Sequence, residues 1–336
     1  MQRRTVLAGL AGLAAAPASR AQQPARIEIS GNRLLWNDAP LRLCGIAMGD
    51  PVYIRAGRSL DDYRVIAQDW AANCVRISVH PGHWRYDSTL MGQYLDADIA
   101  AARAQGLFVI LDWHVIGFPD HYEPIPPPEW GLPPDAYLST IADAIAFWTS
   151  MAQRHGDDPA VLFELWNEPV GHESHWLSDG AWWPDFKQAW MQITAAIRSY
   201  SDNIVLCSGG RWAHDLTGAA ADPLPDPRTA YAWHVYPNED RNDADRWFKS
   251  LGTLAVHKPI IVTEWGFCPG CTDGLAGGLA DFAEPFTQNV LDALGLSHTA
   301  WCYSAGAAPA LLAADGQTPS DYGAFVKAYL TGLRDA

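Results

Sequence analysis

Eight short apolar runs, rich in β-branched residues, recur along this sequence and are separated by longer segments of helical periodicity. Apolar runs of this kind predict strands that are buried on both faces of a parallel sheet, with helices as the crossovers. We expect strands at 41–48, 75–81, 107–114, 161–169, 203–210, 229–237, 259–266 and 298–305. We expect helices at 60–72, 92–105, 136–154, 184–200, 243–256, 279–294 and 321–333. The short, Pro-rich segment between the fifth and sixth runs predicts a distorted helix.

Eight successive strand–helix units with no evident linker predict a closed (β/α)8 TIM barrel, which forms one domain over residues 22–336. A doubly wound sheet is the alternative, but that fold calls for a G-x-G-x-x-G turn after the first strand. The sequence there, LCGIAMGD, does not match it. Ahead of the barrel, two short alternating runs flank Gly31 and Asn32 and predict a β-hairpin.

Residues 1–21 are predicted to be a cleaved signal peptide, because a basic start is followed by a short apolar stretch and a small-x-small ending at Ala21. The pair Arg3 and Arg4 suggests the twin-arginine route, with the Sec route left open. A membrane anchor is the alternative, but the apolar stretch is short for a span. We therefore expect a periplasmic or extracellular protein with no membrane association after cleavage.

Charge and cysteine usage restrict the partners and the compartment. The formal charge is −15, and it becomes −18 without residues 1–21, whose only charged residues are three arginines. A chain this acidic repels polyanions, which argues against nucleic acid as a partner. Cys268 and Cys271 form the only close pair of cysteines, and an oxidising compartment favours a disulfide between them. Buried thiols are expected at Cys44, Cys74, Cys207 and Cys302.

Polar residues gather in the last half of the predicted strands, whereas structural charges would scatter along them. These residues are His80, Asp112, His114, Asn167, Glu168, His234, Tyr236, Glu264, Trp301 and Tyr303. Barrel enzymes place their active sites at the carboxyl ends of the strands, so this clustering predicts a site at that face. The long loops 115–135 and 170–183 leave the same face.

Two of these residues, Glu168 and Glu264, end the fourth and seventh predicted strands. Glycosidic cleavage uses such a pair: one carboxyl protonates the leaving oxygen, and the other attacks the anomeric carbon or activates water. Glu168 then needs a raised pKa, which the charge of Glu264 can provide, and Glu264 needs Arg76 or Tyr236 to keep it ionised. Glu164 shares the parity of Glu168 one layer deeper, and we expect it to bond to Arg76.

The motifs LFELWNEP and IIVTEWG, together with ILDWH and WHVYP, resemble those of glycoside hydrolase family 5, whose members are retaining (β/α)8 enzymes that include many cellulases and β-mannanases. The resemblance covers nearly the whole chain after the predicted signal. It implies that Glu168 is the general acid/base and Glu264 the nucleophile. It also implies supporting roles: Arg76 buttresses the nucleophile, His114 lines the −1 sugar site, Asn167 holds the 2-hydroxyl, His234 and Tyr236 adjoin the two glutamates, and Trp301 forms the platform under the −1 sugar.

The resemblance implies an endo-acting β-1,4-glucanase that cleaves β-linked polysaccharides or oligosaccharides by double displacement. A β-1,4-mannanase or another β-glycanase of the family is the runner-up, followed by a noncatalytic carbohydrate-binding barrel. We expect no metal and no other cofactor, since neither chemical step needs one, and we expect a monomer. Flat rings suit the apolar faces of sugars, so further sugar contacts are predicted at Trp130, Trp176, Trp182, Trp212 and His80.

Overall fold

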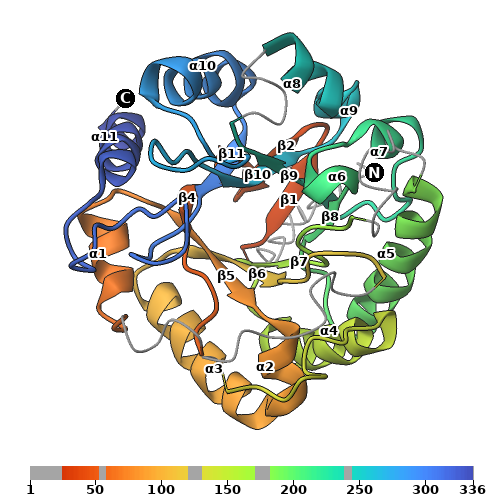
Figure 1. The fold of residues 1–336 in the computed structure, drawn as a ribbon. Helices are drawn as coiled ribbons and strands as arrows, with labels where there is room; N and C mark the ends of the chain where they lie inside the picture. Colours follow the sequence, from red (N-terminus) through yellow and green to blue (C-terminus); the bar gives the residue numbers. More distant parts are fainter. Residues whose placement is uncertain (1–24, 53–57, 120–130, 171–181, 238–243, 336) are drawn as a thin grey trace, which may run out of the picture.

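Eight parallel strands close into a barrel in the order β10-β11-β4-β5-β6-β7-β8-β9, with helices around the outside (Figure 1). The computed structural model describes residues 25–52, 58–119, 131–170, 182–237 and 244–335. The barrel strands are β4 (Cys44–Ala47), β5 (Cys74–Val79), β6 (Phe108–Trp113), β7 (Val161–Glu164), β8 (Val205–Ser208), β9 (Thr229–Val235), β10 (Ile260–Trp265) and β11 (Ser297–Ala300). The predicted TIM barrel is confirmed.

The helices follow the predicted rhythm, with differences that have local causes. They are α1 (Asp62–Gln68), α2 (Pro81–Tyr86), α3 (Ser88–Ala104), α4 (Ile141–His155), α5 (Trp183–Arg198), α6 (Gly210–Ala213), α7 (Thr217–Ala221), α8 (Ala244–Leu251), α9 (Leu254–His257), the π-helical η4 (Leu279–Ala283), α10 (Glu284–Phe286), the π-helical η5 (Thr287–Asp292) and α11 (Asp321–Asp335). The predicted helix 243–256 is two helices, because Gly252 adopts a φ of 57° between them. The predicted helix 279–294 alternates between π and α geometry around Pro285, which has no N–H to donate.

Two further segments bear on the helix predictions. The distorted segment expected between the fifth and sixth strands is present: α6 and α7 are short, and Arg211 and Trp212 have left-handed φ values of 52° and 55°. Helix α2 was not predicted; it begins at Pro81, directly after its cap residue His80. Within the part of the chain that the structure describes, no helix combines the length and apolar character needed to cross a membrane.

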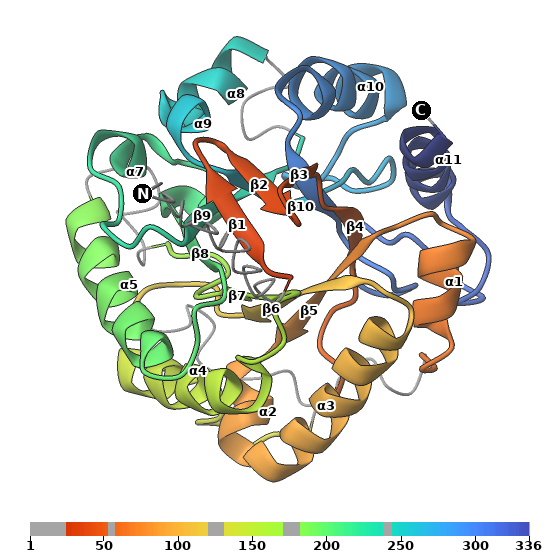
Figure 2. The same cartoon turned by 180° about the vertical axis from the view of Figure 1, so that it is seen from behind.

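The N-terminal segment forms a three-stranded antiparallel sheet: the predicted hairpin is present as its first two strands, and a third strand extends it. Its strands are β1 (Ile27–Ser30), β2 (Arg33–Trp36) and β3 (Ala39–Leu41). The third strand follows a turn at Asn37 and Asp38, which both adopt positive φ. This sheet lies across one end of the barrel (Figure 2), and its Ile27 and Leu34 pack against the interior residues at the start of the strands. The opposite end, where the strands finish, is left for the site.

The interior and the exterior of the barrel have separate apolar cores. Inside, a small cluster that includes Ile110, Leu162 and Ile261 fills the lower layers. Outside, a larger cluster rich in tryptophan packs the strands against the helices, and Trp113, Trp166 and Trp265 belong to it. The four unpaired cysteines are buried, and the predicted Cys268–Cys271 disulfide is formed.

Candidate active site

Arg76 lies at the centre of the site, fully buried inside the barrel. Its Nε and Nη2 donate to the two carboxylate oxygens of Glu164 at 2.6 and 3.1 Å, so the predicted bond between these residues is present. Nη1 donates to Oε1 of Glu264 at 2.7 Å, and Nη2 also donates to Oδ1 of Asn167 at 2.7 Å. One guanidinium on β5 therefore binds the ends of β7 and β10, because its planar fork offers donors in several directions at once.

The position of Glu168 depends on the backbone beyond β7 rather than on strand alternation. The predicted strand 161–169 ends at Glu164, and Trp166, which shares the parity of Glu164, turns outward into the helix-facing core. The chain then attaches to the segment after β6: the Asn167 N–H donates to the Trp113 carbonyl at 3.0 Å, and the Glu168 N–H donates to the Val115 carbonyl at 2.9 Å. These bonds hold Asn167 and Glu168 at the barrel mouth.

A register shift in β10 turns Glu264 toward the interior. Val262 pairs with Trp233 and Glu264 pairs with His234, which leaves Thr263 as an extra residue between them. Val262 packs outside the barrel and Glu264 would share its side in a regular strand, so the bulge reverses the direction of Glu264. Thr263 also reaches the interior, where its hydroxyl donates to Glu164 Oε1 at 2.9 Å.

His234 connects the two glutamates that were predicted to be catalytic. Its Nδ1 lies 2.9 Å from Glu168 Oε1 and 3.8 Å from Glu264 Oε2, and its Nε2 lies 3.1 Å from the Thr263 hydroxyl. Tyr236, two residues further along the chain, donates its hydroxyl to Glu264 Oε2 at 2.7 Å. His234 and Tyr236, both predicted as supporting residues, therefore each contact at least one of the two glutamates.

The environments of the two glutamates push their pKa values in opposite directions. Burial and the charge of Glu264 raise the pKa of Glu168 above its ordinary value, against the opposing effect of His234. Burial would also raise the pKa of Glu264, but His234, Arg76 and His114 outweigh it and lower that pKa. Two carboxyls with divergent pKa values are the pattern of a proton donor beside an ionised partner.

His234 and Glu164, which lie deeper in the barrel, have pKa values that are shifted far from their ordinary values. Burial opposes the charge on His234, but Glu264, Glu164 and Glu168 outweigh it and raise the pKa of this histidine to about 10. Burial likewise opposes the charge on Glu164, but Arg76 and His234 lower its pKa to about 2. The interior thus holds ionised groups of both signs within hydrogen-bond distance, which compensates for their desolvation.

His114 occupies the other side of the site. Its Nδ1 lies 2.7 Å from Oδ2 of Asp112, a fully buried carboxylate that also lies 3.0 Å from Arg76 Nη2. The imidazole is stacked parallel to the ring of Trp301, with 5.2 Å between the ring centroids. Burial would lower the pKa of His114, but Asp112 outweighs it and raises that pKa. The structure therefore brings His114 and Trp301 together, as one wall of the barrel mouth.

A metal ion is a possible occupant to consider, because one atom each of Glu168, His234 and Glu264 lies within 4.8 Å of the others. Both nitrogens of His234 already face hydrogen-bond partners. The guanidinium of Arg76 supplies a fixed positive charge next to Glu264. A metal ion at this position would lie next to the positive charge of Arg76 and would have to displace the hydrogen-bond partners of His234. The three residues therefore fit a bound metal ion poorly.

The predicted sugar contacts beyond Trp301 lie in different settings. Trp182, which precedes α5, is partly buried against the outer core, and Trp212 is partly buried in the left-handed turn after β8. His80 is 5% exposed, and its Nδ1 accepts the Gly82 N–H at the start of α2. Trp130 and Trp176 lie outside the described residues. None of these positions tests sugar binding, and each stays a prediction.

Thr263 was missed as a functional candidate, and Asp112, one of the polar residues expected at the strand ends, was given no role, although both left a signal in the sequence. Thr263 is the one polar residue ahead of the glutamate in the apolar run IIVTEW, and Asp112 is the buried acid in ILDW. An isolated polar residue in an otherwise apolar barrel strand requires a partner inside the barrel. That reasoning identifies such residues, but their partners come from other strands and are visible only in the fold.

A (β/α)8 barrel whose mouth holds two close carboxyls with divergent pKa values defines the class of glycoside hydrolases that work with paired acids. The family model described as Cellulase (glycosyl hydrolase family 5) matches residues 40–307. The chain therefore belongs to glycoside hydrolase family 5.

Individual relatives agree with this membership. The chain is 28% identical to Endoglucanase 5 of Pectobacterium carotovorum over 88% of its own length and 53% of that protein. It is 27% identical to Endoglucanase A of Evansella cellulosilytica over 75% of its length and 49% of that protein. The chain thus spans about half the length of these curated relatives.

Solved structures share the fold. A β-glucanase from Saccharophagus degradans, solved with cellotetraose, superposes with a TM-score of 0.80 at 23% identity and covers 93% of this chain and 95% of that one. The catalytic domain of an endoglucanase from Thermobifida fusca superposes with a TM-score of 0.73 at 21% identity, over 91% of this chain and 97% of that one.

Proposed function

We propose that this protein is a retaining, endo-acting β-1,4-glucanase in which Glu168 is the general acid/base and Glu264 the nucleophile. The observation that carries the proposal is the spacing of the pair: a carboxylate oxygen of Glu168 and one of Glu264 lie within 4.8 Å of each other. Retaining enzymes hold their carboxyls about 5–5.5 Å apart, whereas inverting enzymes need roughly 6.5–9.5 Å to admit water. The separation of these two oxygens therefore favours the retaining arrangement.

In the first step, the Glu264 carboxylate attacks the anomeric carbon while the glycosidic C–O bond breaks. Glu168 gives its proton to the leaving oxygen, and a covalent glycosyl–enzyme ester remains on Glu264. Glu168 is suited to donate because its pKa is raised, and Glu264 is suited to attack because Arg76 and Tyr236 hold it ionised and oriented. The surroundings of each glutamate thus determine its role: Glu168 acts as the acid and Glu264 as the nucleophile.

In the second step, ionised Glu168 takes a proton from a water molecule, whose oxygen attacks the anomeric carbon and releases Glu264. Glu168 thereby regains its proton. The site must stabilise Glu168 as an anion in this step, and His234 faces its Oε1 at 2.9 Å. Two inversions at the anomeric carbon give net retention.

Asn167 supports the placement of the sugar next to this pair. Its Oδ1 accepts from Arg76, which leaves its Nδ2 buried and without a partner among the described residues. An unpaired donor in such a site favours a ligand acceptor, and the sugar 2-hydroxyl is a suitable one. Trp301, stacked on His114, presents a flat ring on the side where a pyranose face would pack.

The β-1,4-glucan preference rests on the relatives, several of which are named endoglucanases, and on structural neighbours solved with cellotetraose. A β-1,4-mannanase with the same catalytic pair would act through the same steps, so the substrate panel has to separate the two. We further propose that the protein acts outside the cytoplasm, where such polymers occur, and as a monomer.

The test is release of reducing sugar from carboxymethyl cellulose, barley β-glucan, mannan and xylan. We expect highest activity on the glucans, with Glu168→Gln and Glu264→Gln each reducing it at least about a thousandfold. Product anomers, followed by NMR during hydrolysis, should keep the β configuration. Wild-type activity in either variant, or inverted products, would contradict the assignment; preference for mannan would overturn only the substrate.

A further inference from the structure

Thr263 occupies a position that the proposed reaction does not explain. It is fully buried, and its hydroxyl bridges Glu164 and His234. Strand alternation directs Thr263 into the barrel, opposite to Val262. The bulge that follows turns Glu264 to the interior as well, so two consecutive residues of β10 face the site.

The direction of the hydrogen bonds at Thr263 follows from the inventory of donors. A hydroxyl has one proton, and the carboxylate of Glu164 is held ionised by Arg76, so it can only accept. The Thr263 proton therefore points to Glu164 Oε1, at 2.9 Å. The hydroxyl then has only a lone pair left for Nε2 of His234, at 3.1 Å, so Nε2 must carry a proton.

This arrangement determines which nitrogen of His234 faces the acid/base. With Nε2 bonded to Thr263, Nδ1 is the nitrogen that faces Glu168, and it lies 2.9 Å from Oε1. The raised pKa of His234 keeps a proton on Nδ1 as well. Nδ1–H can donate to Oε1 when Glu168 is ionised, and it can donate to the same oxygen when the carboxyl carries its proton on Oε2. The same contact thus fits both states that the two-step reaction requires.

We propose that Thr263 is a positioning residue that, together with Glu164, holds the Nε2 proton of His234 and so keeps Nδ1 directed at Glu168 through both steps. The proposal rests on the proposed function, because it concerns the acid/base of that reaction. Thr263 touches no reacting atom and acts only through His234. Glu164, which was predicted to bond to Arg76, also accepts the hydroxyl proton of Thr263 and so fixes the orientation of that hydroxyl.

The consequences for pH dependence involve every charged group around His234. The charged and titratable groups are Glu164 on β7, Glu168 beyond it, Glu264 on β10, Tyr236 after β9, Arg76 on β5 and His114 after β6. The Nδ1 atom of His214 lies 2.9 Å from the backbone carbonyl oxygen of His234. Losing the acceptor at Nε2 disfavours the charged ring, and the neighbouring carboxyls then lose a cation. Their pKa values should rise, so both limbs of the activity profile should move to higher pH.

Thr263→Val and Thr263→Ser form a matched pair for the test. Valine keeps the shape and removes the hydroxyl, whereas serine keeps the hydroxyl and removes a methyl group. We expect Thr263→Val to lower kcat/KM on barley β-glucan about tenfold, the effect of one charge-assisted hydrogen bond, and to shift both limbs upward. Thr263→Ser should recover most of the activity and the wild-type limbs. Equal loss in both variants, or unshifted limbs in Thr263→Val, would overturn the proposal.

An NMR measurement keeps the proposal testable if the valine variant folds poorly. In wild-type protein labelled with 15N-histidine, the His234 signals are those that disappear in His234→Gln. We expect Nε2 to show a protonated resonance at neutral pH. An unprotonated Nε2 would overturn the proposal without any activity measurement. Failure of the proposed function looks different: wild type would then hydrolyse none of the glycans, or Glu168→Gln and Glu264→Gln would remain active.

Discussion

Arg76 Nη1 lies 2.7 Å from Oε1 of Glu264, and this bond is made entirely inside the barrel, where Arg76 is 0% and Glu264 4% exposed. Burial alone would lower the pKa of Arg76, but Asp112, Glu164 and Glu264 outweigh it and keep the guanidinium charged. A cation held in this way, together with His234, lowers the pKa of Glu264 and so favours its ionised form. The stability of the site and the reactivity of its proposed nucleophile therefore depend on the same side chain.

Arg76→Lys should impair both activity and folding. Lysine keeps the charge but cannot make the forked bonds to Glu164, Glu264 and Asn167. We expect kcat/KM to fall at least about a hundredfold and the free energy of unfolding to fall by about 3 kcal/mol, as when a buried ionic network is broken. Urea unfolding and glucan hydrolysis measure the two effects.

Arg64→Lys is the matched control, because the pair of Arg64 and Asp61 is exposed on α1. Exposed pairs contribute little, so the urea unfolding curve of this variant should coincide with that of wild type. Equal effects of the two substitutions would mean that burial of the Arg76 network has no special importance.

Asp112→Asn should show whether the charge of Asp112, rather than its position, controls the pKa of His114. The amide oxygen can take the place of Oδ2, which faces His114 and Arg76, while the amide nitrogen takes the place of Oδ1, which has no partner among the described residues. Asp112 raises the pKa of His114 against the effect of burial, so removing its charge should lower that pKa. We expect a downward shift in the NMR titration of His114 and about a tenfold lower kcat/KM. An unchanged titration would show that Asp112 does not control this histidine.

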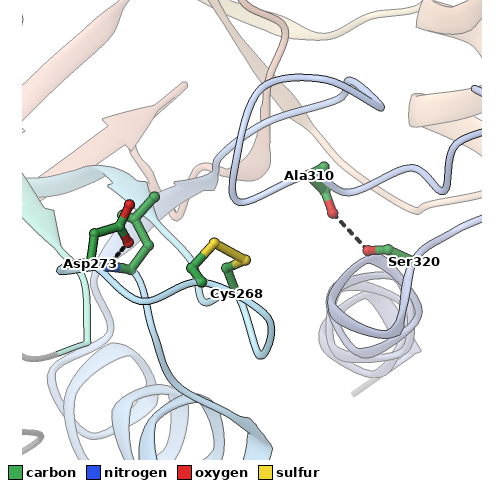
Figure 3. The surroundings of a disulfide bond; sticks show 6 residues. Cys268, Asp273, Ala310 and Ser320 are labelled. Carbon is green, nitrogen blue, oxygen red and sulfur yellow. Dashed lines mark hydrogen bonds between the residues drawn. A yellow bond between two sulfur atoms is a disulfide. The ribbon is translucent and has the colours of Figure 1, made fainter.

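Removing the disulfide should have a modest effect on stability. Cys268 and Cys271 are three positions apart in the loop after β10, where Asp273 also accepts the Leu275 N–H (Figure 3). A crosslink that closes so short a loop restricts the unfolded chain little, so Cys268→Ser with Cys271→Ser should lower the free energy of unfolding by at most about 2 kcal/mol. The Cys268 N–H bond to Leu275, at 2.8 Å, remains, and activity should stay within about twofold. Wild type treated with reductant should match the double variant; a loss of activity in both would assign the disulfide a role in the site.

His298 should make the protein sensitive to acid. It is fully buried beside Trp265 and Tyr329, and burial, with the charge of Arg42, lowers its pKa from 6.5 to about 3. Between these two values the unfolded chain binds a proton that the folded chain does not, so stability falls as pH drops through this window.

His298→Gln should remove this dependence, since glutamine does not titrate. The difference in unfolding free energy between wild type and variant should shrink by about 3 kcal/mol from pH 6.5 to about pH 4, at 1.36 kcal/mol per unit. Urea titrations at a series of pH values measure it, and subtraction of the two curves cancels the titration of the carboxylates. Parallel curves would show that His298 does not carry the effect.

The sequence alone was enough to predict the barrel fold and the principal residues of its site. Apolar runs and helical segments alternate so regularly that the (β/α)8 fold follows from periodicity, and the carboxyl ends of parallel strands must then meet at one face. Arg76, Glu168 and Glu264 were identifiable because polar residues in buried strands need partners or a function. Preferences for helix or strand act over a few residues, so they can be recognised in the sequence.

Only the tertiary structure decided how the two glutamates are aimed. Strand alternation would direct Glu264 outward, and the bulge at Thr263 reverses it; β7 ends at Glu164, and backbone bonds to the neighbouring segment place Glu168. Both deviations depend on hydrogen bonds between strands far apart in sequence, which no local pattern encodes. For the same reason, the sequence shows Thr263 only as a polar residue in an apolar run, and its contact with His234 exists only once β9 and β10 pair.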